Sequence, residues 1–220
     1  MAKEELEARV EKLEAIHAIQ NLQAKYGYYL QRGSSANWDE MVDLFTDDCI
    51  CEIMDSGVHV GKAGVINLYK EAKTRLHAPG LMGIIMQIQP YIEVYGDTAK
   101  GIWQGFGFIA HAQAKSGASG SAEEKMASWH HGRYENEYRK VNGEWKISKS
   151  HFRLVFQTPY GAENGWVSHP VDSTVKQQFR DMGLTLTGPV DKPTTGHRPY
   201  NPLAKTPEEA IPDPILPPPA

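Results

Sequence analysis

The sequence lacks the features on which several large classes of protein depend. Lys and Arg number 23 against 27 Asp and Glu, so the formal net charge is −4. This balance gives no electrostatic reason to expect binding to nucleic acid or to an anionic membrane. No apolar run approaches the ~20 residues that span a bilayer, and the residues from Met1 to Glu5 lack the apolar stretch of a signal peptide. We therefore expect a cytoplasmic protein.

Cysteine is also scarce, since Cys49 and Cys51 are the only two. They lie two apart on a predicted strand, where a disulfide would be strained, and two thiols without neighbouring ligands make a poor zinc site. The sequence has no phosphate-binding glycine loop, nucleophile elbow or dinucleotide-binding motif, and no histidines or carboxylates at metal-ligand spacing. We therefore expect no metal or organic cofactor, and two thiols that line the core or a pocket.

Apolar residues at steps of three and four predict one long amphipathic helix over residues 4–30. Its first three turns are rich in charge and are expected to brace a neighbouring subunit or the flank of the domain. The apolar seam consists of Leu6, Val10, Leu13, Ile16, Ile19 and Leu22. The other predicted elements are helices over 38–45 and 63–76 and strands over 49–54, 58–60, 81–94 and 99–114.

Asn142-Gly143 marks a β-hairpin between two runs of strand-forming residues, because both residues tolerate the positive φ that a primed turn requires. The hairpin sets the register of the strand before it. Alternation divides that strand into two faces: His130, Gly132, Tyr134 and Asn136 on one, and His131, Arg133, Glu135 and Glu137 on the other.

The first of these faces has the composition of a pocket wall, with a titratable His and a phenol separated by a glycine. A solvated edge strand is the alternative. If a bulge reverses the alternation, a basic set would face inward instead and form an anion-binding site: His131, Arg133, His151 and Arg153.

The strand pattern decays after Tyr160, and ten of the fourteen prolines follow Gly188. Such a segment cannot form a core, so we expect an arm that lies over its own domain or a partner, or is disordered. The predicted organisation is a helical extension over 1–14, a domain over 15–160 and a Pro-rich arm over 161–220. Three helices followed by an antiparallel meander predict an α+β fold whose bent sheet wraps the first helix around a cone-shaped cavity.

Four motifs in this order resemble the NTF2-like superfamily, in its SnoaL-like branch, over about residues 15 to 160. They are Ala18–Leu22, Leu44–Asp48, Ile92–Ala99 and Asn142–Ile147. The resemblance implies a cone in which three N-terminal helices pack in a strongly bent, mostly antiparallel sheet. It says little about function, because this superfamily includes dehydratases, isomerases, cyclases, dehydrohalogenases and proteins that are not enzymes.

The chain departs from two superfamily members, scytalone dehydratase and hexachlorocyclohexane dehydrochlorinase, which use an Asp on the first helix and a His on a strand. By alignment these positions fall on Gln31 and Ile85. Gln cannot act as a Brønsted base, so any chemistry must use other residues.

The same alignment predicts the residues of the pocket. His130 is the first candidate for proton transfer, and Tyr134 is expected within roughly 7 Å of it, where the two could share a proton relay. Tyr26 and Gln31 are expected to hold substrate hydroxyls. The predicted lining consists of Trp103, Phe152, Leu30, Cys51, Ile85, Gln87, Gly105, Gly107, Gly132 and Ser150.

Inward glycines on strands either widen the cavity for a flat ligand or mark β-bulges that bend the sheet. Three further residues, His59, Arg75 and His77, could line the mouth, although an exposed surface position is the simpler interpretation for each.

The overall layout is similar to that of the sphingomonad 1,2-diarylpropane-1,3-diol lyases, which act in the catabolism of lignin-derived aromatic compounds. This resemblance implies a cofactor-free lyase that converts a diarylpropanediol to a stilbene and formaldehyde through a quinone methide. A dehydratase or isomerase of another aromatic or polyketide-like compound, and a binding module for a hydrophobic ligand, remain open. Because the outer face of such a sheet is usually apolar, we expect a homo-oligomer.

Overall fold

The structure of the chain is a computed structural model, and it describes residues 3–31, 38–54, 57–76, 82–114, 123–168, 190–196, 198–211 and 213–220. The helices are α1 (Lys3–Tyr29), α2 (Trp38–Val42), α3 (Gly61–Leu76), α4 (Gly165–Ser168) and α6 (Pro207–Ala210). The strands are β1 (Phe45–Ile53), β2 (Val58–Val60), β3 (Met82–Tyr95), β4 (Thr98–Ala114), β5 (Glu123–Val141) and β6 (Glu144–Pro159).

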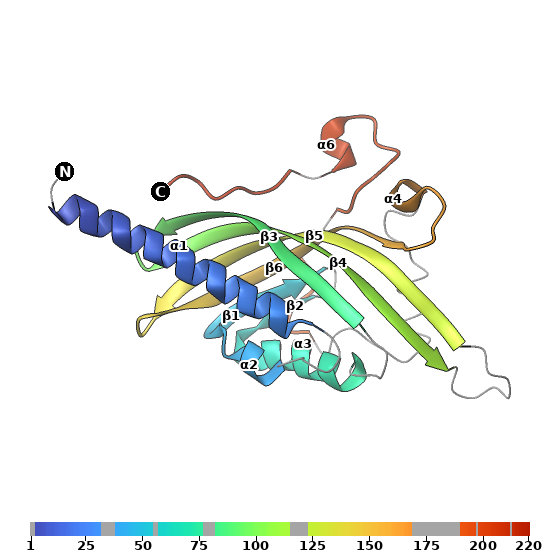
Figure 1. Ribbon diagram of the computed structural model, residues 1–220, viewed down its shortest axis with the longest axis horizontal. Helices are drawn as coiled ribbons and strands as arrows, with labels where there is room; N and C mark the ends of the chain where they lie inside the picture. Colours follow the sequence, from blue (N-terminus) through green and yellow to red (C-terminus); the bar gives the residue numbers. More distant parts are fainter. Residues whose placement is uncertain are drawn as a thin grey trace.

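The strands form one curved, six-stranded sheet in the order β2-β1-β6-β5-β4-β3 (Figure 1). All neighbours are antiparallel except β1 and β6, which are parallel. The predicted hairpin joins β5 to β6, with φ of 52° at Asn142 and 85° at Gly143. These are the left-handed values that a primed turn needs. The α+β fold is therefore confirmed.

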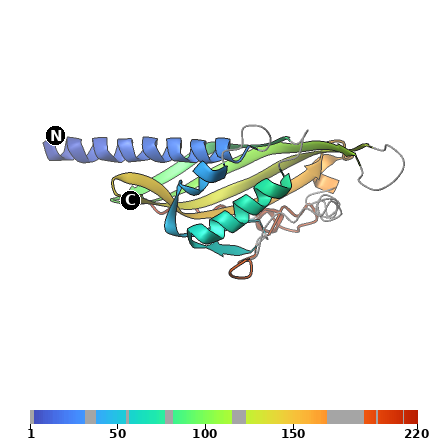
Figure 2. The same ribbon diagram turned by 90° about the horizontal axis from the view of Figure 1, so that it is seen from below.

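Helix α1 lies along the inner, concave side of the sheet and contributes Ala15, Ile19, Leu22 and Tyr26 to the core. Its N-terminal part extends beyond the sheet (Figure 2). There the apolar side chains of the seam that the sequence predicts, Leu6, Val10 and Leu13, are exposed by 45–66%.

The sequence-based alternation of β5 holds, because His130 and Tyr134 are buried on the inner face beside Phe152. His131 lies on the outer face against Phe106 and Phe156. The register of β5 with β6 shifts between His131 and Gly132, which is a β-bulge, yet the inner set stays inward. The reversed arrangement, with an anion site facing inward, is therefore wrong.

Two predictions about β1 and β2 need correction. Strand β1 begins at Phe45, earlier than predicted, because Phe45 pairs with Ile147 of β6. His59 on β2 is not at the surface but fully buried, since it pairs with Cys51 of β1 and lies against α3, where a Cβ on Gly64 would lie 3.2 Å from the His59 Cβ. The side chain of Arg75 and all of His77 lie outside the described part of the chain, as do the predicted turns at 33–37, 55–56 and 79–80 and the loop at 115–122.

The described part of the C-terminal arm runs over its own domain. Lys192 of the arm pairs with Val58 of β2, and the end of the arm reaches β3, where the Tyr95 hydroxyl donates to the Pro218 carbonyl. The Ala220 amide donates to Glu93 there, at 3.4 Å. The arm thus spans the sheet from one edge strand to the other.

Among the described residues, no helix combines the length and apolar character that crossing a membrane requires.

Candidate active site

A pair of buried tyrosines forms the centre of the inner face. Tyr26 of α1 and Tyr69 of α3 bring their hydroxyl oxygens to 2.7 Å, and the Cys51 thiol of β1 lies 3.7 Å from the Tyr69 oxygen. Tyr26 is completely buried, and its ring makes edge contacts with Phe45, Tyr69 and Tyr134. Three elements that are distant in sequence thus place hydroxyl and thiol groups in one apolar environment.

Burial keeps these groups protonated. Burial and the neighbouring Tyr134 raise the pKa of Tyr26 well above its ordinary value, and burial does the same for the pKa of Tyr69. Burial also raises the pKa of Cys51 to about 12. At neutral pH the cluster therefore presents neutral hydroxyls that can donate hydrogen bonds, and a thiol that is not a nucleophilic thiolate.

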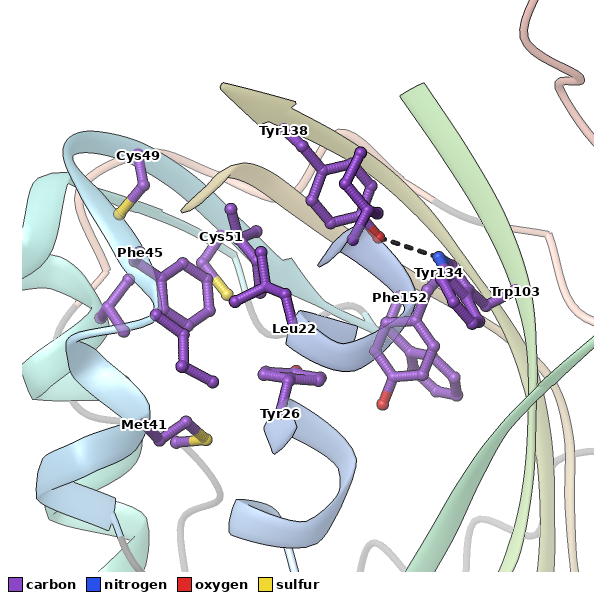
Figure 3. Close-up of a cluster of buried hydrophobic side chains, with 14 of the residues drawn as sticks. Leu22, Tyr26, Met41, Phe45, Cys49, Cys51, Trp103, Tyr134, Tyr138 and Phe152 are labelled. Atoms are coloured by element: carbon purple, nitrogen blue, oxygen red, sulfur yellow. Dashed lines mark hydrogen bonds between the residues drawn. The ribbon is translucent and has the colours of Figure 1, made fainter. Parts of the chain in front are cut away.

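The predicted relay between His130 and Tyr134 does not form in this structure. The two residues are four apart on β5, which separates their Cα atoms by ~13 Å at ~3.3 Å per residue. The ring of Phe152 contacts both, with its centroid 5.3 Å from that of His130 and 4.5 Å from that of Tyr134. Both side chains therefore contact Phe152, and Tyr134 lies beside Tyr26, with ring centroids 5.8 Å apart (Figure 3).

The glycines of the inner face do not border open space. A Cβ atom on Gly132 would lie 2.3 Å from Cζ of Phe152, and one on Gly105 would lie 2.9 Å from ring atoms of Phe152 and Tyr134. On Gly107 it would lie only 1.8 Å from the Ile84 carbonyl oxygen of β3. The interpretation as a widened cavity is corrected here: two glycines accommodate the protein's own rings, and the third allows close strand contact.

A second polar cluster surrounds Gln23 of α1, which is fully buried. Its Oε1 accepts hydrogen bonds from the Tyr138 hydroxyl at 2.8 Å and from Asn136 Nδ2 at 3.0 Å, and its Nε2 donates to Gln87 Oε1 at 2.8 Å. The Trp103 indole N–H donates to the same Tyr138 hydroxyl at 2.8 Å (Figure 3). Trp103, which the sequence predicts as part of the pocket lining, is thus also part of an internal network.

The remaining predicted residues divide between two places. Ser150 is fully buried on the inner face, with Cys51 on the neighbouring strand. Gln31, Ile85 and Gln87 instead line a cavity of about 270 Å³ between the end of α1 and β3. Leu30 packs against the core nearby.

Two central residues, Tyr69 and Gln23, are absent from the sequence-based site. Tyr69 follows Val65 and Leu68 at helical spacing, and all three are buried. The amphipathic pattern of α3 could therefore have predicted that Tyr69 faces the core. Gln23 precedes Tyr26 by three residues and therefore shares its face of α1. A glutamine on an apolar face was a detectable anomaly.

The sequence model of the SnoaL-like domain matches residues 11–151. No curated protein sequence matches the chain. Among solved structures, hexachlorocyclohexane dehydrochlorinase LinA-type3 from Novosphingobium barchaimii LL02 is 18% identical with a TM-score of 0.54, covering 70% of this chain and 96% of that chain.

Two structures from Novosphingobium aromaticivorans are similar to a comparable degree. A protein assigned as a scytalone dehydratase is 18% identical with a TM-score of 0.50, covering 69% of this chain and 91% of that one. A protein assigned as an aromatic ring hydroxylase is 18% identical with a TM-score of 0.51, covering 67% and 94%. At this identity the likeness shows the fold alone.

Proposed function

The chain belongs to the SnoaL-like domain family, and on that premise we propose that it is a cofactor-independent enzyme that performs acid–base chemistry on an aromatic substrate. The observation that carries the proposal is the buried Tyr26–Tyr69 hydroxyl pair at 2.7 Å. Two neutral phenols in a dry, aromatic environment can donate hydrogen bonds to an oxygen on which negative charge develops. Such donors promote the departure of a substrate hydroxyl.

The reaction that we propose is the conversion of a 1,2-diarylpropane-1,3-diol with a para-phenol to a stilbene. Loss of the phenolic proton and the benzylic hydroxide releases water and leaves a quinone methide. Deprotonation of the terminal hydroxyl then breaks the bond to the hydroxymethyl carbon, which departs as formaldehyde. The released electron pair forms the stilbene double bond and restores the phenolate, so the sequence needs no external oxidant or reductant.

The residues of the inner face take complementary roles in this proposal. Within the hydroxyl pair of Tyr26 and Tyr69 one phenol donates to the other, and the second phenol donates to the departing benzylic hydroxyl. His130 is the base for the phenol or the terminal hydroxyl. Gln31, at the end of α1, holds a hydroxyl from the side of the 270 Å³ cavity. Phe152 must rotate for a ring to reach both Tyr26 and His130, and that rotation would vacate a ring-sized space above Gly105 and Gly132.

The test is a turnover assay with purified protein and a para-hydroxylated diarylpropanediol, in which formaldehyde and stilbene fluorescence are measured together. We expect equimolar products, and no reaction when the para-oxygen is methylated, because the quinone methide then cannot form. Tyr69→Phe should lower kcat by ~10²-fold, whereas Tyr160→Phe, at an exposed tyrosine, should not. Loss of water without formaldehyde would instead identify a dehydratase, and a thermal shift without turnover would identify a binding module.

We also propose that the chain is a cytoplasmic homo-oligomer. The exposed seam of Leu6, Val10 and Leu13 on the projecting part of α1 supports association through this segment. Light scattering should give a multiple of the mass of one chain at micromolar concentration. A single-chain mass would contradict this proposal.

A further inference from the structure

Residues 190–192 of the C-terminal arm pack on the edge of the sheet next to α3. The Val58 amide of β2 donates to the Lys192 carbonyl at 2.9 Å, and the Asp191 amide donates to the Val58 carbonyl at 3.0 Å. Gly57 permits this approach, because a Cβ there would lie 2.8 Å from Val190 and its φ is 98°. The backbone of β2 is therefore shaped to receive the arm.

A buried carboxylate anchors the next residues of the arm. Glu52 of β1 is 3% exposed and points to the outer face, opposite Cys51. Its Oε1 accepts from the Thr194 hydroxyl at 2.6 Å and the Thr195 amide at 2.7 Å, and its Oε2 accepts from the Thr195 hydroxyl at 2.6 Å. Three hydrogen bonds to one ionised carboxylate attach this segment of the arm to β1 specifically.

The same segment reaches the first turn of α3. Asp191 Oδ2 accepts a hydrogen bond from the Val60 amide at 2.7 Å, immediately before α3 begins at Gly61. The carboxylate also approaches Gly64, where a Cβ would lie 2.9 Å from it. Asp191 thus supplies an acceptor for the amide that precedes this 16-residue helix, and its negative charge at the helix N-terminus complements the helix dipole.

Helix α3 carries Tyr69, whose hydroxyl must meet that of Tyr26 on a different helix. Tyr69 lies eight residues after Gly61, and therefore ~12 Å along the axis at ~1.5 Å per residue. A small tilt of α3 about its buried residues Val65 and Leu68 would separate the two hydroxyls. Whatever holds the first turn of α3 therefore also sets the geometry of the hydroxyl pair.

We propose that Asp191, Thr194 and Thr195 are positioning residues that hold α3, and through it the Tyr69 hydroxyl, in the arrangement the candidate active site requires. These residues lie outside the span 11–151 that the family model matches. The arm thus completes a site that the shared domain builds only in part. The effect on turnover rests on the proposed function, whereas the effect on α3 does not.

The primary test measures how α3 packs on β1, with no assumption about the reaction. Cys51 of β1 is fully buried, with its thiol next to the Tyr69 hydroxyl of α3. Its rate of labelling by a thiol reagent therefore reports separation of α3 from the sheet. Asp191→Ala and the double variant Thr194→Ala/Thr195→Ala should each raise that rate by ~10-fold. Thr206→Ala, which removes the cap of α6 elsewhere in the arm, is the matched control and should leave it unchanged.

Fragment-ion mass spectrometry distinguishes Cys51 from Cys49, and hydrogen exchange of the α3 amides measures the same release without cysteine chemistry. If Cys51 labelling and α3 exchange in the Asp191 and Thr194/Thr195 variants match those of Thr206→Ala, the inference is wrong.

The second test follows turnover of the diarylpropanediol by the full chain. Asp191→Ala should lower kcat by ~10-fold with KM changed less than twofold, because substrate contacts remain while the hydroxyl pair is misplaced. Asp191→Asn, which keeps an acceptor but not the charge, should restore part of the rate. Unchanged kcat in an active enzyme would overturn the inference, whereas inactivity of the parent chain would overturn the proposed function and leave Cys51 labelling to decide.

Discussion

The two faces of β5 and β6 differ in the kind of polar interaction that they contain. On the inner face, hydroxyl and amide groups such as those of Tyr138, Asn136 and Gln23 bond to one another and carry no formal charge. On the outer face of the same strands, Arg153 Nε donates to Glu135 Oε2 at 2.7 Å, and His151 lies 3.6 Å from Glu52. Because successive residues of a strand point to opposite faces, those on the inner face form uncharged hydrogen bonds and those on the outer face form charged contacts.

The difference follows from what covers each face. Helices α1 and α3 seal the inner face with apolar side chains, where an ion would incur a large desolvation penalty. The outer face is partly wet and is crossed by the C-terminal arm, whose amides and hydroxyls stabilise Glu52. Since a shift of one residue would exchange the two sets, the Asn142-Gly143 turn protects both clusters.

The largest expected effect compares two adjacent histidines on opposite faces. His130→Ala should lower kcat/KM by ~10²–10⁴ if His130 handles a proton, with a smaller effect on stability. His131→Ala removes an outer-face imidazole packed between Phe106 and Phe156 and should change kcat/KM by less than ~5-fold. Steady-state kinetics and urea unfolding of both variants check this. A larger loss of kcat/KM in His131→Ala than in His130→Ala would show that His130 is not part of the active site.

Filling the inner face should come next in size. Gly107→Ala should destabilise the fold by ~3 kcal/mol or more, because its Cβ would collide with the Ile84 carbonyl, which cannot move without disturbing β3. Gly161→Ala is the control, with nothing within 4 Å of the added atom. Chemical denaturation measures both. Gly132→Leu should likewise unfold the protein rather than merely block a substrate. A stable Gly132→Leu variant would show that the Phe152 ring can move to make room for the new side chain.

Acid should destabilise the chain in two stages. Burial lowers the pKa of His59, His131 and His151, so each stays neutral in the fold while the unfolded chain takes up a proton below pH ~6.5. Stability should therefore fall from that pH downward, by up to ~1.4 kcal/mol per pH unit for each histidine. Urea midpoints across pH 5–8 measure the slope, and His151→Gln should flatten it.

Glu52 determines the second stage of acid destabilisation, which occurs at lower pH. Burial opposes its ionisation, but the hydrogen bonds from Thr194 and Thr195 outweigh this and lower the pKa of its carboxyl. Its contribution should persist above the ordinary pKa of ~4.3 and disappear as the pH falls through the lower folded value. Glu52→Gln should remove this second stage, and it should extend the first stage to lower pH, because loss of the carboxylate beside His151 lowers the pKa of that imidazole further.

The smallest effect should come from the exposed rim. Lys100 and Lys149 both lie 3.9 Å from Glu137, and all three side chains are more than 40% exposed. Lys100→Ala should change stability by less than ~0.5 kcal/mol. A thermal melt that shifted by many degrees would show that charge, rather than coverage by the arm, stabilises the outer face.

The sequence predicted well wherever the cause is local. The hairpin at Asn142-Gly143 placed His130 inside and His131 outside, and the apolar period of α1 placed Tyr26 in the core. It failed where two distant segments meet. Strand periodicity cannot show that Phe152 occupies the space above Gly132, that His59 lies beneath α3, or that Thr195 covers Glu52.

Sequence alone determined the α+β fold, the family, the inward set on β5 and the absence of a recognisable nucleophile or cofactor motif, because these depend on periodicity and short motifs. Tertiary structure decided which inward groups act together. The Tyr26–Tyr69 pair joins residues 43 apart, and the Glu52–Thr195 contact joins residues 143 apart. Such contacts depend on how whole elements pack and on which atoms fill each gap, and neither is recorded in the residues of a single segment.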